Sequence, residues 1–210
     1  QSGGRLFTGG QDGMIWQIDP KAGVSIGQYE LDQELVAPML VSNDLLIAAT
    51  FDGKLTAYRA TDDRNALLQT VWQTDIGTAV FDMRVVGNNL IVSDMGGQLS
   101  SINSRDGDIS WQAIVHRNAR YWSTVNRQKL YSLTNTGTLN ILDLQSGKQL
   151  DQLQFSGEFS RPPLVQDDTI VLFDINGVNK GGALSASLKR RTPLSMASTP
   201  VTRNTPGLNP

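Results

Sequence analysis

A glycine recurs in this chain at nearly constant spacing, each time between two short apolar segments. The steps between successive glycines are 40, 44, 40 and 40 residues, and the series consists of Gly13, Gly53, Gly97, Gly137 and Gly177. An aliphatic residue stands seven positions before each glycine, as Leu130 does before Gly137. A repeat of this length is typical of proteins that stack one supersecondary unit against the next.

Each repeat unit predicts several short antiparallel strands. The turns at the glycines read DG, DG, GG, TG and NG, and most of these are tight hairpin turns whose positive φ angles Gly, Asn and Asp reach at least cost. A second turn and a third strand follow, as in LQSG and then KQLDQLQF. A fourth strand is expected just ahead of each unit, in VAPMLVSND, YWSTVNRQ and SRPPLVQDD. Four such strands in about 40 residues form one propeller blade.

The predicted fold is therefore an all-β β-propeller of four-stranded antiparallel blades, with about five blades visible. Its single domain spans residues 1–204, and the repeat units are approximately 5–44, 45–89, 90–128, 129–168 and 169–204. Both faces of a strand carry apolar residues: Leu139 and Ile141 on one face, Leu142 and Leu144 on the other. A blade that lies between two neighbours hides both of its faces, so the pattern favours radial stacking.

The C-terminal segment suggests how a ring could close. MASTPVTRN, residues 196–204, resembles the fourth-strand segments LVAPMLVSN and FSRPPLVQD. One hypothesis is that residues near 199–203 pair with the blade begun by residues 5–10, which leaves 205–210 as a loose tail. The alternative is that the chain forms part of a larger propeller whose other blades lie elsewhere. An open array would leave a long edge strand exposed.

Two units depart from the common pattern. The second unit is four residues longer, and RATDDRNALLQ, residues 59–69, is predicted to contain a lengthened outer connection. In the fifth unit, GGALSA at 181–186 looks like the start of a strand displaced by about five residues. A longer hairpin loop over INGVNKGG, residues 175–182, would accommodate that displacement.

The repeat resembles a known class of propellers. The segment IVSDMGGQLSSINSRDGDISW, residues 91–111, is similar to the repeat of quinoprotein-like (PQQ-repeat) propellers, with Trp111 at the closing tryptophan position and Trp72 at the same position in the longer second unit. Residues 5 to about 190 resemble BamB-type outer-membrane assembly lipoproteins, which usually show eight units. That resemblance implies a scaffold without a cofactor, bound to protein partners in the bacterial envelope.

WD40 propellers are a second resemblance. GGQDGMIWQIDPKAG and NTGTLNILDLQSGK are similar to the latter half of the WD40 repeat, with Asp19 and Asp143 at its terminal acidic position. Ile18 and Leu142 stand where that repeat has tryptophan, and the chain contains no GH pair. The quinoprotein-like interpretation therefore fits the residues better.

A fold alone does not determine function, so catalytic and ligand sites need their own support. The chain has no cysteine and one histidine, His116, which cannot supply the usual ligands of zinc. Quinoprotein dehydrogenases, by family resemblance, commonly use a vicinal cysteine pair. We therefore predict no catalytic residue, no metal and no cofactor, and interpret His116 as a surface residue at a strand end. The alternative is a quinoprotein-type ligand-binding or dehydrogenase-derived domain.

Two short segments are candidate partner-binding sites. HRNARYW combines residue types that are enriched at interface hot spots, namely Arg117, Arg120, Tyr121 and Trp122. The alternative is that Trp122 packs between blades while the arginines are solvated. LKRR could meet an acidic partner or a lipid headgroup through Lys189, Arg190 and Arg191. Such short basic runs also occur simply as solvated surface.

Charge and hydropathy restrict the classes of partner that the chain can bind. The formal net charge is −2, and no basic stripe interleaved with aromatic residues is present, which argues against nucleic acid. The sequence has no apolar run long enough to span a membrane. Because the chain opens with Gln1, we expect a processed protein whose missing leader could have carried a lipid anchor. The family resemblance favours the periplasm or the outer membrane, with the cytoplasm as the alternative.

Overall fold

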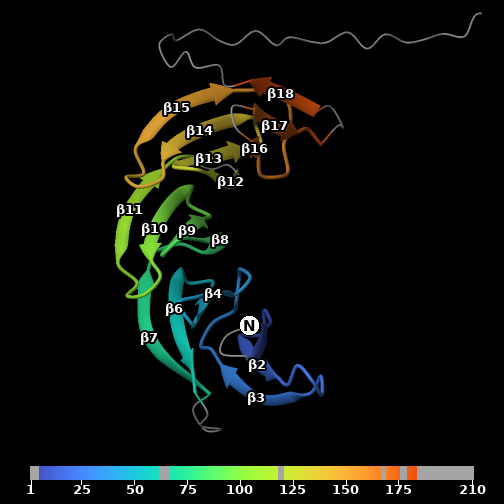
Figure 1. The fold of residues 1–210 in the computed structure, drawn as a ribbon, viewed down its shortest axis with the longest axis vertical. Helices are drawn as coiled ribbons and strands as arrows, with labels where there is room; N and C mark the ends of the chain where they lie inside the picture. Colours follow the sequence, from blue (N-terminus) through green and yellow to red (C-terminus); the bar gives the residue numbers. More distant parts are fainter. Residues whose placement is uncertain (1–4, 62–66, 118–120, 167–168, 176–178, 184–210) are drawn as a thin grey trace, which may run out of the picture.

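The computed structural model describes residues 5–61, 67–117, 121–166, 169–175 and 179–183. Every helix or strand element in these ranges is a β-strand, and every pairing between strands is antiparallel. The strands form five separate sheets (Figure 1). The predicted all-β propeller architecture of about five blades is thereby confirmed.

Strands follow one another within each sheet in chain order. The first sheet contains β1 (Leu6–Gly9), β2 (Met14–Ile18) and β3 (Ser25–Glu30). The second contains β4 (Leu40–Ser42), β5 (Leu45–Ala49), β6 (Lys54–Ala60) and β7 (Leu68–Asp75). The third contains β8 (Val80–Val86), β9 (Asn89–Asp94), β10 (Gln98–Asn103) and β11 (Ile109–Ile114). The fourth contains β12 (Tyr121–Asn126), β13 (Lys129–Thr134), β14 (Thr138–Asp143) and β15 (Gln149–Gln154), and the fifth contains β16 (Leu164–Gln166), β17 (Thr169–Phe173) and β18 (Asn179–Ala183).

The repeat units and the sheets are out of phase by one strand. The fourth-strand segments predicted ahead of the units are present as β4, β12 and β16, and each pairs with the strand that follows it. A repeat unit such as 45–89 therefore ends on the first strand of the next sheet, β8. The second, third and fourth blades are each built from one strand of the preceding unit and three strands of their own.

The five sheets succeed one another along an arc (Figure 1). The first strands of the sheets lie on the inner side, where β4 contacts β8 and β12 contacts β16. The last strands, β7, β11 and β15, lie on the outer side. Residues 196–204, which were expected to close a ring, lie outside the described residues, so ring closure stays a hypothesis.

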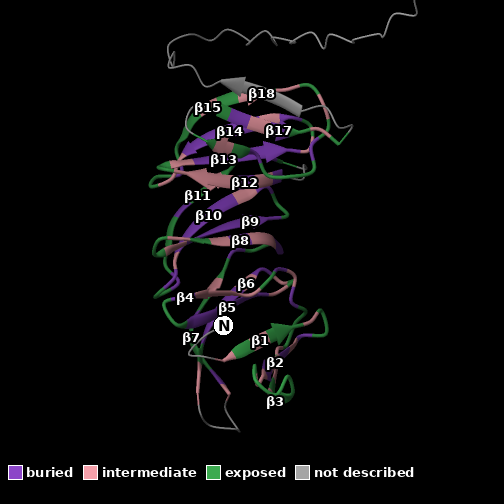
Figure 2. Ribbon diagram, turned by 45° about the vertical axis from the view of Figure 1, so that its right-hand side comes forward, coloured by how far each residue is buried: buried purple, intermediate pink, exposed green. Residues whose placement is uncertain are grey.

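Apolar side chains fill a layer between each pair of consecutive sheets. Four buried clusters occupy the four layers, and the middle strands are the most buried (Figure 2). Leu139 and Ile141 on β14 belong to the cluster with the fifth sheet, whereas Leu142 belongs to the cluster with the third sheet. The two-faced apolar pattern therefore predicted radial stacking correctly.

The turn glycines adopt the positive φ angles that the sequence predicts. Gly97 has φ 85° and Gly137 has φ 90°. The chain also passes very close to these residues: a Cβ added at Gly97 would lie 1.3 Å from the carbonyl oxygen of His116. Val115 N and His116 N both donate to the carbonyl oxygen of Gly97, at 2.9 and 3.1 Å. The turn is thus fastened to the segment that leaves the same sheet.

The structure agrees with the connection predicted in the second unit and contradicts the displaced strand predicted in the fifth unit. The connection between β6 and β7 spans residues 61–67, inside the predicted segment 59–69. The displaced strand predicted in the fifth unit is wrong, because β18 begins at Asn179 and keeps the common register. Ile170, seven residues before Gly177, pairs with Gly182, just as Leu130 pairs with Leu142.

The physical reason for this register lies in β17. Ile170 and Leu172 are buried against the fourth sheet. A slip of β17 by one residue against β16 would turn both side chains away from that layer. The apolar face of β17 therefore holds that strand in place, and β18 pairs with it from Asn179 in the register of the other units.

Candidate interaction surface

The path of the chain places one set of turns at one end of the sheets. Because each sheet is a meander, the hairpin between its second and third strands lies at the same end as the connection to the next sheet. Hydrogen bonds join the two kinds of segment: Ile76 N donates to Gly53 O at 3.0 Å, and Met95 N donates to Ala79 O at 2.9 Å. We call this end, which carries the repeating glycines, the glycine-turn end.

Tryptophan side chains lock consecutive sheets together at the opposite end. Trp72 Nε1 donates to the carbonyl oxygen of Ser104 at 3.1 Å, and Trp111 Nε1 donates to that of Leu144 at 3.0 Å. Each indole also covers a glycine of the next sheet, where an added Cβ would lie 2.7 Å from the Trp72 ring at Gly107 and 2.4 Å from the Trp111 ring at Gly147. The predicted closing positions of both tryptophans are confirmed.

The fourth sheet lacks this lock. In the third sheet Trp111 pairs with Ser101, immediately before a register shift, and in the fourth sheet Asp151 pairs with Ile141 at the equivalent place. An aspartate cannot cover a neighbouring glycine as an indole does. The layer between the fourth and fifth sheets therefore depends on its apolar cluster.

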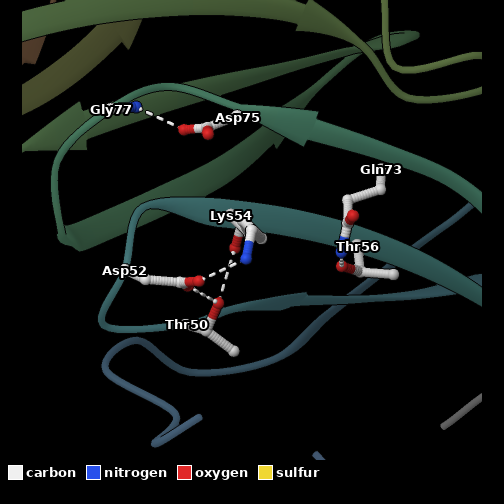
Figure 3. A network of polar contacts seen from close by, with 7 residues as sticks. All are labelled: Thr50, Asp52, Lys54, Thr56, Gln73, Asp75 and Gly77. Carbon is white, nitrogen blue, oxygen red and sulfur yellow. Dashed lines mark hydrogen bonds and ion pairs between the residues drawn. The ribbon is translucent and has the colours of Figure 1, made fainter. Parts of the chain in front are cut away.

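The turn between β5 and β6 carries a polar network at the glycine-turn end (Figure 3). Thr50 Oγ1 donates to Asp52 Oδ1 at 2.7 Å, and Lys54 Nζ donates to Asp52 Oδ2 at 2.6 Å. The hydrogen bonds from Lys54 and Thr50 lower the pKa of the Asp52 carboxyl. This partly exposed ion pair contributes little to stability, but it holds the turn in one conformation.

Two more aspartates lie around the same lysine. The pKa of Lys54 is raised first by its hydrogen bond with Asp52 and also by the charges of Asp75 and Asp32. Asp75 sits at the end of β7, where its Oδ1 accepts a hydrogen bond from Gly77 N at 2.8 Å (Figure 3). Lys54 therefore contacts Asp52 directly, and Asp75 and Asp32 lie near enough to act on its charge.

Large apolar side chains occupy the tips of the neighbouring turns. Phe51, on the turn between β5 and β6, is 58% exposed, and Met95, on the turn between β9 and β10, is 65% exposed. Both stand two positions before a repeating glycine, where the first and fourth sheets have Gln11 and Asn135. Neither residue is among the candidate sites that the sequence predicts. Turn tips usually carry Gly, Pro, Asn, Asp or Ser, so an apolar residue there was a usable signal.

The predicted segment HRNARYW is divided between surface and core. Arg117 is exposed in the connection after β11, and Trp122 is half-buried on β12, paired with Leu133. Arg120 lies outside the described residues, as do Lys189, Arg190 and Arg191 of the basic run. Partner binding by Arg117 and Trp122 therefore stays a prediction.

Tyr121 has a structural role that its sequence context did not reveal. Its side chain is 1% exposed and packs edge to face against Phe81, with ring centroids 5.0 Å apart. Its hydroxyl donates to the carbonyl oxygen of Gln98 at 2.7 Å and accepts from Asp94 N at 3.1 Å. Burial raises the pKa of this hydroxyl. Tyr121 joins the third and fourth sheets, and a partner cannot reach its ring at the surface.

The interpretation of His116 as a surface residue is wrong. The imidazole is buried between the third and fourth sheets, with its ring centroid 5.3 Å from that of Tyr121. In the tautomer protonated at Nε2, this nitrogen donates to the carbonyl oxygen of Ser132 at 3.4 Å, and Nδ1 accepts from Asn140 Nδ2 at 3.3 Å. Burial lowers the pKa of His116, because the charged form loses its hydration.

This burial makes the stability of the chain pH-dependent. Neutral His116 stabilises the fold fully above its ordinary pKa of about 6.5, and that contribution is lost as the pH falls below 6.5 toward the lowered pKa of the folded state. We expect the midpoint of urea unfolding to fall between about pH 7.5 and about pH 5.5. The chain has one histidine, so His116→Gln should reduce this decline. An equal decline in the variant would contradict the assignment.

The quinoprotein-type alternative predicts charged groups that converge on the inner side of the arc. On β8, Arg84 Nη2 donates to Asp82 Oδ2 at 2.8 Å, and both side chains are about one-third exposed. Among the described residues, no three His, Cys, Asp or Glu side chains are arranged to hold a metal ion. The same residues contain no helix long and apolar enough to cross a membrane.

Comparison with known proteins places this architecture in a family. The family model described as outer membrane protein assembly factor BamB matches residues 2–128. The chain belongs to the BamB family. It is 25% identical over 166 residues to outer membrane protein assembly factor BamB of Legionella pneumophila (strain Paris), covering 79% of this chain and 42% of the relative. The BamB protein of Burkholderia pseudomallei (strain K96243) is 24% identical over 188 residues, covering 81% and 47%.

Solved structures support the fold alone. BamB from Moraxella catarrhalis superposes with a TM-score of 0.65 at 14% identity, covering 87% of this chain and 59% of that one. The C-terminal WD40 domain of Sif2 gives a TM-score of 0.69, also at 14% identity, and covers 87% and 55%. The chain spans about half the length of the two BamB relatives above. The PQQ-repeat resemblance of the sequence is confirmed by the family match.

Proposed function

We propose that this chain is a non-enzymatic scaffold that binds protein partners during the assembly of outer-membrane proteins. The observation that carries the proposal is the BamB family match over residues 2–128. In this chain, tryptophans join the second sheet to the third and the third to the fourth. The relatives are named assembly factors of outer-membrane proteins. A role in the bacterial envelope, on the periplasmic side of the outer membrane, follows from the same proposal.

The architecture suits such a role because it holds its turns rigidly. Backbone hydrogen bonds fasten the glycine turns to the connections between sheets, and tryptophans fix the opposite end. A surface that is already ordered loses little conformational entropy when a partner docks. Binding residues are commonly found on loops that a rigid scaffold positions in this way. Arg117 is exposed on one such connection and remains a candidate contact.

The proposal predicts a defect in outer-membrane proteins when the gene is deleted from its host. Folded β-barrel proteins resist unfolding by detergent in unheated gel samples and migrate apart from the unfolded form, so the folded fraction of an abundant outer-membrane protein can be measured directly. We expect that fraction to fall and to recover when the gene is restored. Periplasmic proteins that do not enter the outer membrane serve as the control. An unchanged folded fraction would refute the assembly role.

A further inference from the structure

We propose that the glycine-turn end of the second and third sheets binds an extended protein segment in which a large apolar side chain is flanked by Lys or Arg. This inference deepens the scaffold function and rests on it for the class of partner, a protein. The surface consists of the two turn tips, Phe51 and Met95, and the acidic side chains Asp32, Asp52 and Asp75. We call it the turn-tip surface.

The two apolar tips belong to one continuous surface because the same loop lies between them. A Cβ added at Gly53 would lie 2.6 Å from Thr78 N, and one added at Gly96 would lie 3.5 Å from Thr78 Cγ2. Thr78 therefore contacts the turn of the second sheet and also the turn of the third sheet. Phe51 belongs to the first of these turns and Met95 to the second, and both side chains are exposed.

Both tips are exposed although their turns are tightly held. Their backbones are fixed, since Phe51 N donates to the carbonyl oxygen of Glu34 at 3.0 Å and Met95 N donates to that of Ala79 at 2.9 Å. The side chains nevertheless remain more than half exposed. Aromatic residues and methionine are enriched at protein interfaces, and methionine adapts to different partners. A rigid backbone that presents exposed apolar side chains is suited to docking.

The charge around the tips selects the partner. Asp32 and Asp75 are exposed, and Asp52 is partly exposed. Lys54 is the basic side chain among them, and it is held by Asp52 at 2.6 Å. The charged group around Phe51 is therefore negative overall, whereas Arg117 adjoins the turn that carries Met95. Basic side chains on a partner would gain favourable electrostatic interactions here, which raise the association rate and select the partner.

The same charge disfavours other occupants. Nucleic acid and the anionic headgroups of membranes carry negative charge and would be repelled. A symmetric dimer would bring the same acidic surface of two copies together, because a two-fold interface uses one patch on both subunits. An extended segment with basic residues around an apolar side chain matches both the charge and the two tips.

The first experiment measures binding of a labelled peptide in which one leucine is flanked on each side by two lysines. We expect binding by fluorescence anisotropy to weaken about tenfold for the double variant Phe51→Ser, Met95→Ser. We also expect it to weaken between about 50 mM and about 300 mM salt, because exposed charges are screened. Val24→Ser changes an equally exposed apolar residue at the opposite end and should bind as the unchanged chain does.

Three results would contradict the proposal that the turn-tip surface binds such a segment. They are equal peptide binding by the double variant, equal binding of a peptide with glutamate in place of lysine, and loss of binding in Val24→Ser. Both tips are exposed, so the variants should retain their unfolding midpoints. A second measurement is independent of substitution: the methyl resonance of Met95 should shift on addition of the lysine peptide, and an unchanged resonance would contradict the proposal.

A cellular experiment separates failure of this surface from failure of the assembly role. The double variant is expressed in the deletion host and compared with the unchanged chain and Val24→Ser. If the unchanged chain restores the folded fraction of outer-membrane protein and the double variant does not, the turn-tip surface is supported. If both restore it, the surface is refuted while the assembly role stands. If deletion of the gene does not change the folded fraction, the assembly role is refuted. The peptide measurement then decides by itself whether the turn-tip surface binds the lysine peptide.

Discussion

Gly97→Ala is expected to lower the free energy of unfolding by about 3 kcal/mol or more. Gly97 has φ 85°, and a left-handed conformation costs a residue with a Cβ about 1–2 kcal/mol. The added Cβ would also overlap the carbonyl oxygen of His116, at 1.3 Å. Relieving such an overlap requires a backbone shift that typically costs about 1–3 kcal/mol. Urea denaturation followed by circular dichroism measures the loss.

Gly87→Ala is the matched control for this prediction. Gly87 also has a positive φ, 61°, but no heavy atom lies within 4 Å of the position that its Cβ would take. The control should therefore lose only the conformational contribution, about 1 kcal/mol. Equal losses in Gly97→Ala and Gly87→Ala would show that the close approach of His116 has no energetic consequence.

The sequence predicted the blades well because the relevant signals are local. A turn glycine between two short strands marks a hairpin within about a dozen residues, and the repeat shows this glycine five times. The apolar residues on both faces of β14 likewise indicated that a neighbouring sheet covers each face of this strand. Even the fifth sheet obeys the same register around Gly177. The error there came from weighing a glycine pair above the apolar residues of β17.

Buried polar residues could not be predicted in the same way. His116 follows a strand that the sequence marks clearly, but its burial depends on Ser132 and Asn140 of the next sheet. Tyr121 is likewise tied to the preceding sheet through Gln98. Such contacts join residues that the local pattern does not relate to each other. The same limit explains why the sequence does not reveal the burial of Tyr121 within HRNARYW.

The candidate surface was predictable only in part. The apolar residues at the turn tips stand at a fixed position before the glycines, so Phe51 and Met95 could have been found by aligning the repeat units. Their relation to Thr78, and the grouping of Asp32 and Asp75 around Lys54, depends on how connections between sheets fold over the turns. That arrangement depends on contacts between neighbouring blades, so the sequence of a single repeat unit does not show it.

Trp111→Ala is expected to lower the free energy of unfolding by about 3–5 kcal/mol, the range for truncating a buried aromatic residue. Trp111 is buried between the third and fourth sheets, covers Gly147 and donates to the carbonyl oxygen of Leu144. The substitution removes the apolar packing and the hydrogen bond, and leaves a cavity in the layer. Trp111→Phe keeps most of the packing and should lose less.

The control for Trp111→Ala lies on the same strand. Ile114 is 56% exposed on β11, and Ile114→Ala should change the free energy of unfolding by less than about 1 kcal/mol. Stacked repeats are stabilised by contacts between nearest neighbours, so weakening one layer can separate the unfolding of the units on its two sides. Trp111→Ala should therefore also broaden the urea transition or split it in two. A loss no larger than that of Ile114→Ala would show that the tryptophan does not lock the sheets.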